Sequence, residues 1–116
     1  MTMALCLNCG DLKFGALCPC PACNAGPSGD VDLDITFSDH QYSEETLEEF
    51  GNVIKAIQNA SPDDPVERYW AFLQYVSIHH PSILTIDLNE DIAKRVERVL
   101  AAISVPPIAL KPGWRG

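Results

Sequence analysis

Five cysteines lie within the first 23 residues of this 116-residue chain. Four of them form two Cys-x2-Cys pairs separated by ten residues: Cys6 with Cys9, and Cys20 with Cys23. Two sulfurs with this spacing can bind one metal ion when the chain turns tightly, and such a turn favours a residue that tolerates positive φ directly after the second cysteine. Gly10 and Asn24 occupy those two positions. The pattern predicts a tetrahedral site of four thiolates, for which zinc is the best-suited metal.

The fifth cysteine, Cys18, forms an additional Cys-x-Cys with Cys20. It could replace Cys20 as the third ligand, or it could be a free thiol. Four ligands with one spare thiol explain an odd number of cysteines better than a disulfide framework does. Iron bound by the same sulfurs is the alternative to zinc. Because four protein sulfurs leave no position open for water or substrate, we expect a structural role for the ion.

The segment from residue 5 to residue 24 resembles the short zinc ribbons built like rubredoxin, in which two cysteine knuckles face each other across a hairpin. The resemblance implies a β-hairpin here, with the four knuckle cysteines as the metal ligands. The sequence departs from that family at Cys18, which has no counterpart in the family pattern. The resemblance covers about a sixth of the chain, and the remainder carries no recognised motif.

The rest of the sequence predicts an α+β fold in which one strand and three helices follow the hairpin. Apolar and polar residues alternate strictly over residues 31–37, which is typical of a half-buried strand. Three later segments have apolar residues at helical spacing, and each segment follows a residue suited to cap a helix. The expected caps are Ser43, Asp64 and Asn89, and the helices are expected to end near residues 60, 79 and 103. We expect these helices to pack around Trp70 and Phe72.

These elements divide the chain into three expected parts. Residues 1–25 form a metal-binding module, 31–104 a small helical domain with one leading strand, and 105–116 an extended proline-rich tail. The prolines of the tail are incompatible with a regular helix. The tail is expected to cover the core of its own domain or to dock on a partner.

The charge of the chain limits its partners. Sixteen acidic residues against eight basic ones give a net charge of -8, which argues against nucleic acid or an anionic membrane surface as the main partner. Residues 30–49 hold eight carboxylates and neither lysine nor arginine, as expected for a solvated face or a docking surface for a basic protein. No secretory pattern or long apolar run is evident, which favours a cytoplasmic protein without membrane attachment.

The function predicted from these features is that of a non-catalytic intracellular zinc protein acting as a protein–protein interaction or adaptor module. Phosphate-binding loops and nucleophile elbows are absent from the sequence. The alternative is a small metal-dependent enzyme that uses His40, His79 or His80. A nucleic-acid-binding zinc ribbon is disfavoured, because Lys13 is the only basic residue among the first 24.

Overall fold

The structure, a computed structural model, describes residues 3–15, 18–24, 26, 31–39, 41–103 and 108, without the side chains of 31–33. Within these residues the chain forms an α+β fold of one two-stranded antiparallel sheet and four helices. The elements in chain order are β1 (Met3–Leu5), β2 (Leu12–Phe14), α1 (Val31–Thr36), α2 (Glu44–Ala60), α3 (Pro65–His79) and α4 (Glu90–Ala101). The N-terminal hairpin expected from the cysteine pattern is therefore present.

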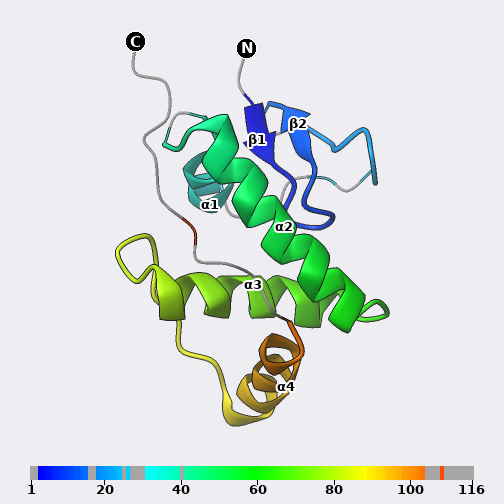
Figure 1. Cartoon of the computed structure of the whole chain (residues 1–116), viewed down its shortest axis with the longest axis vertical. Coiled ribbons are helices and arrows are strands. Elements are labelled where there is room, and N and C mark those ends of the chain that lie inside the picture. The colour runs from blue at the N-terminus through cyan, green and yellow to red at the C-terminus, as the bar shows by residue number, and fades with distance from the viewer. Residues whose placement is uncertain are drawn as a thin grey trace.

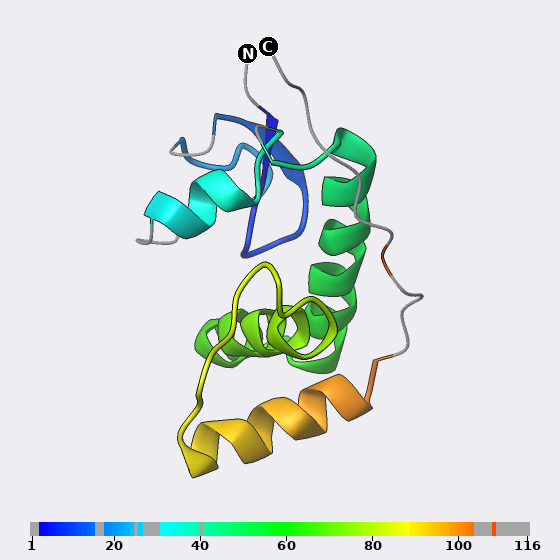
Figure 2. The same cartoon turned by 90° about the vertical axis from the view of Figure 1, so that its left-hand side faces the viewer.

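Helix α2 contacts both strands and both later helices (Figure 1). The hairpin lies beside its N-terminal half, α1 packs against β1 on the side of the hairpin away from α2, and α3 crosses α2 at the other end (Figure 2). Helix α4 packs mainly against α3 and lies furthest from the hairpin. Because β1 and β2 both contact α2, the segment that carries the cysteines is joined directly to the helices. The division into a metal module, a helical domain and a tail stays a prediction.

The three later helices begin where the sequence placed them. Each expected cap accepts a hydrogen bond, at 2.9–3.2 Å, from the backbone N–H of the third helical residue: Ser43 from Thr46, Asp64 from Glu67, and Asn89 from Ile92. These bonds satisfy N–H groups that have no partner within the helix. The carboxylate of Glu67 accepts from the Ser61 hydroxyl at 2.9 Å, which fixes the turn between α2 and α3. Helix α4 ends at Ala101, slightly earlier than expected.

The prediction of a strand over residues 31–37 is wrong, because residues Val31–Thr36 form helix α1. Over six residues, alternation is a weak guide, since positions i and i+4 share a face in both a strand and a helix. Only the following residues pair with the hairpin: the N–H of Leu5 donates to the carbonyl of Phe37 at 2.8 Å, and Ser38 forms an isolated bridge with Ala4. The segment therefore joins the hairpin through residues 37–39.

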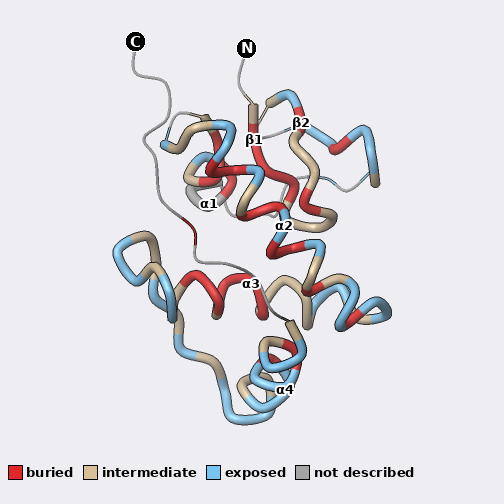
Figure 3. Tube along the Cα trace, viewed as in Figure 1, coloured by how far each residue is buried: buried red, intermediate tan, exposed pale blue. Residues whose placement is uncertain are grey.

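Three phenylalanines form the centre of the core. The ring of Phe37 lies 5.3 Å from the rings of both Phe50 and Phe72, and those two rings are 6.1 Å apart. All three are at most 1% exposed. Trp70, which we expected at the centre, is half-buried and packs at the margin. Figure 3 shows the buried positions gathered along β1, one side of α2 and the middle of α3.

Of the expected tail, only Ile108 is described. Its side chain is 8% exposed and belongs to the same core as the three phenylalanines. Leu110 and Trp114, which with Ile108 are the tail residues expected to contact a partner if the tail docks on one, lie outside the described residues.

Candidate metal centre

The two Cys-x2-Cys pairs lie in tight turns of the same kind. In the first turn, which connects β1 to β2, the N–H of Gly10 donates to the carbonyl of Cys6 at 2.9 Å. In the second, the N–H of Asn24 donates to the carbonyl of Cys20 at 2.8 Å. Gly10 has a φ of 84° and Asn24 a φ of 63°, so both adopt the left-handed conformation expected from the sequence. The residue after each pair is thus what allows the turn to close.

The four sulfur atoms converge on one point. All four Sγ atoms lie within 4.8 Å of one another, with Cys6 3.6 Å from Cys23 and Cys9 3.7 Å from Cys20. Four sulfurs at about 2.3 Å from a tetrahedral zinc ion are about 3.8 Å apart. A disulfide would require about 2.05 Å, and all five cysteines are free thiols. The cluster therefore has the donor atoms and the dimensions to hold a metal ion.

Burial affects the protonation of two of the four thiols, Cys6 and Cys9. The side chains of Cys6 and Cys20 are at most 2% exposed, and Cys9 and Cys23 are half-buried. Loss of solvation is the main effect that raises the pKa of both the Cys6 and the Cys9 thiols above the ordinary cysteine value. Thiols in such a place stay neutral at physiological pH unless a cation displaces their protons.

Two polar side chains support the turns. The amide Nδ2 of Asn8 donates to the Cys23 sulfur at 3.5 Å, a contact of the kind that orients metal ligands. The ammonium group of Lys13, in a side chain that is only 3% exposed, donates to the carbonyl of Cys18 at 2.8 Å. Lys13 therefore ties the segment before Cys20 to strand β2. Sequence reasoning missed both roles, although the position of Asn8 between two cysteines is a signal for one of them.

The first turn is also attached to α2. A Cβ atom added at Gly10 would collide with the carbonyl oxygen of Gly51, and one added at Gly51 would collide with that of Gly10. Next to this contact, the Lys55 ammonium pairs with the Asp11 carboxylate at 2.9 Å. These contacts were also missed. A glycine inside an otherwise well-formed helix, such as Gly51, is the available sequence signal for a close backbone approach.

The other candidate residues do not converge on the cluster. Cys18 is exposed, and its sulfur is not among the four that lie together. His79 is exposed at the end of α3, His80 is the residue that caps that end, and His40 lies outside the described residues. In the described part of the chain, the four cysteines are the only group of three or more ligand side chains spaced for a metal ion.

His80 is in an apolar setting that favours its neutral form. Its ring lies 5.7 Å from that of Phe50, and its Nε2 atom is buried without a hydrogen-bond partner. Burial, and secondarily the charge of His79, lowers the pKa of His80. Below a pH of about 6.5 the unfolded chain therefore binds the proton more readily than the folded one, and stability falls.

We expect the melting temperature to fall less between pH 7.5 and 5.5 in His80→Gln than in the unsubstituted protein, because the variant lacks this titration. His79→Gln removes only the smaller of the two causes that lower the pKa of His80, so this variant should retain most of the original pH dependence. Thermal unfolding followed by circular dichroism checks both variants. Equal pH dependence in all three proteins would contradict the burial argument.

The acidic segment 30–49 is less uniform than a solvated face. Asp34 is only 5% exposed, and the carboxylate of Asp39 accepts a hydrogen bond from the N–H of Met3 at 3.1 Å. On α2 itself, three of the acidic side chains are exposed: Glu44, Glu45 and Glu48. Among the side chains of this segment that the structure describes, the exposed negative charge therefore lies on the first two turns of α2.

Comparison with known proteins finds no matching family model, no matching curated protein and no matching solved structure. Among the helices in the described part of the chain, none combines the length and the apolarity that a bilayer crossing requires. The cysteine cluster and the charged surface of α2 are then the features from which a function can be inferred.

Proposed function

We propose that Cys6, Cys9, Cys20 and Cys23 hold a structural zinc ion and that the protein is a non-catalytic interaction or adaptor module of the cytoplasm. The observation that carries the metal assignment is the agreement of the sulfur separations, 3.6 and 3.7 Å, with those of a tetrahedral zinc tetrathiolate. The ion would keep the thiols deprotonated and join the two turns. We propose the cytoplasm because it is a reducing compartment, in which the cysteines are not oxidised to disulfides.

A binding role is favoured over catalysis by the saturation of the site. Four protein sulfurs occupy every position of a tetrahedral ion, so neither water nor substrate can be activated there. The two described histidines offer no second site, since His79 is exposed and His80 packs against Phe50. Nucleic acid is disfavoured as well, because the buried Lys13 is already bonded to a carbonyl oxygen and presents no cation to a phosphate.

The partner expected for this module is a basic protein. The exposed carboxylates of α2 give it a surface of one charge sign, and attraction between such surfaces weakens as salt screens it.

Purified protein should contain one zinc ion per chain by elemental analysis and should capture a basic partner from lysate in a salt-sensitive manner. Charge reversal at all four glutamates of the first turns, Glu44, Glu45, Glu48 and Glu49, should abolish capture without reducing the zinc content. Iron in place of zinc would overturn the metal assignment. Capture that is indifferent both to salt and to charge reversal would overturn the proposed partner class.

A further inference from the structure

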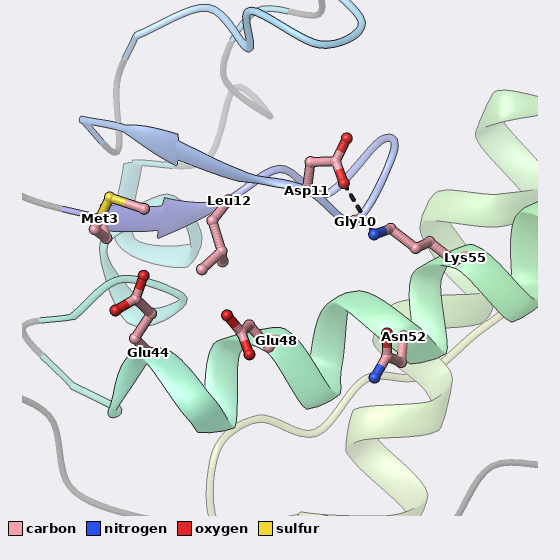
Figure 4. A pocket seen from close by; sticks show the side chains of 8 residues that line it. All are labelled: Met3, Gly10, Asp11, Leu12, Glu44, Glu48, Asn52 and Lys55. Carbon is pink, nitrogen blue, oxygen red and sulfur yellow. Dashed lines mark ion pairs between the residues drawn. The ribbon is translucent and has the colours of Figure 1, made fainter.

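A groove of about 450 Å³ runs between the hairpin and α2. Figure 4 shows its walls: the side chain of Leu12 points from the hairpin toward α2, and those of Glu44 and Glu48 point from α2 toward the hairpin. Met3 and Leu12 are both half-buried and give the hairpin side an apolar surface. The groove thus has apolar side chains on its hairpin wall and carboxylates on its α2 wall.

The charge of this groove is not balanced by its own cation. Lys55, at the far end, pairs with Asp11 at 2.9 Å and also senses the charge of Glu48, so one cation faces the three carboxylates that line the groove (Figure 4). Neither Glu44 nor Glu48 forms an ion pair with another described residue, and both side chains are exposed. The groove therefore presents two carboxylates that a cationic ligand could neutralise.

The spacing of the two carboxylates limits the shape of that ligand. Glu44 and Glu48 are one helical turn apart, which places them about 6 Å from each other along α2. An extended peptide presents every second side chain on the same face, at intervals of about 6.5 Å. Lysine and arginine also have aliphatic stems that pack on apolar surface while their charged ends reach a carboxylate. Met3 and Leu12 provide such a surface beside the two glutamates.

We propose that this groove binds an extended segment of a partner protein that carries lysine or arginine at two alternate positions, one for Glu44 and one for Glu48. The inference rests on the proposed interaction function and assigns it to one place on the molecule. The end of the groove is formed by Gly10 and Asp11, which directly follow Cys9, so the metal-binding turn also shapes the docking surface.

The chain supplies a matched control on the same helix. Glu45 and Glu49 are each one residue further along α2, about 100° around the helix axis, and neither lines the groove. The double variant Glu45→Gln/Glu49→Gln therefore removes the same net charge as Glu44→Gln/Glu48→Gln, but from a different face. A difference between the two variants reports the groove and not the total charge.

The probe is a fluorescein-labelled nonapeptide that alternates lysine with threonine, titrated with the full chain by fluorescence anisotropy at an ionic strength of about 0.05 M. We expect Glu44→Gln/Glu48→Gln to weaken binding about tenfold, and the control variant to weaken it by about twofold or less. Zinc content and far-ultraviolet circular dichroism, measured on both variants, exclude loss of the fold as the cause.

Two results would overturn the proposal. If both double variants bound the peptide equally weakly, the peptide would be attracted by the overall charge of the protein and not by the groove. The proposed function of binding a basic partner would then stand, but the groove would not be its binding site. A wild-type protein that captures a basic partner from lysate yet does not bind the lysine peptide would have its docking surface elsewhere.

Discussion

Replacement of Cys9 by serine is expected to abolish tight zinc binding and to lower the melting temperature by more than about 10 °C. The reason is that the three remaining sulfurs cannot fill the four positions of a tetrahedral ion. The two cysteine turns would then lose the ion that joins them, next to which the sulfur atoms of Cys9 and Cys20 lie 3.7 Å apart. Metal binding to a small domain contributes several kcal/mol of folding free energy, and each kcal/mol corresponds to about 4–8 °C in a domain of this size.

Cys18→Ser is the control for this experiment. Cys18 is exposed and outside the cluster, so its replacement should change neither the zinc content nor the melting temperature by a measurable amount. Cys9 is a better test position than the fully buried Cys20, because a serine hydroxyl at a half-buried site remains partly hydrated.

Elemental analysis and differential scanning calorimetry, with and without a strong chelator, provide the measurements. Chelation of the unsubstituted protein should reproduce the loss of stability seen in Cys9→Ser. An unchanged melting temperature after complete chelation would show that the ion is not structural. Loss of zinc in Cys18→Ser would instead place Cys18 among the ligands.

Features determined by neighbouring residues could be predicted from the sequence. The caps at Ser43, Asp64 and Asn89 depend on a hydrogen bond that spans three residues, and all three are present. The left-handed conformations of Gly10 and Asn24 follow from the local needs of a tight turn. The grouping of the cysteines also follows from spacing, because each pair converges within its own turn.

Features determined by distant residues could not be predicted in this way. The helix over Val31–Thr36 ends where Phe37 enters the core between Phe50 and Phe72, and those partners are 13 and 35 positions further along the chain. The helices were expected to pack around Trp70 and Phe72, but Phe37, Phe50 and Phe72 fill the centre of the core and Trp70 packs at its margin. No local sequence pattern indicates which aromatic side chains will pack against one another in the core.

The contact between Gly10 and Gly51 is the most consequential of these distant relations. It places the backbone of the first cysteine turn directly on the backbone of α2. The Lys55–Asp11 ion pair beside it is roughly half exposed on both sides and contributes little by comparison. The close approach of the two backbones therefore leaves no room for a side chain at either glycine.

Gly51→Ala is expected to destabilise the protein, although alanine inside a helix is normally about 1 kcal/mol more favourable than glycine. The added methyl group would collide with the carbonyl oxygen of Gly10, and relief of such overpacking costs about 1–3 kcal/mol beyond the helical gain. Because relief requires the first turn to move away from α2, zinc should also pass faster to a chromogenic chelator. Calorimetry and stopped-flow metal transfer measure the two effects.

Asn59→Ala provides the comparison, since Asn59 is exposed near the end of the same helix and gains only the usual benefit of alanine. We expect this variant to be as stable as the original protein or slightly more so, with unchanged zinc transfer. If Gly51→Ala were stabilised to the same extent, the turn could not lie against α2 as closely as the two glycines place it. If Gly51→Ala lowered the stability but left the rate of zinc transfer unchanged, the contact between Gly10 and Gly51 would contribute to packing alone. The metal centre would then be independent of α2, the helix that forms one wall of the acidic groove.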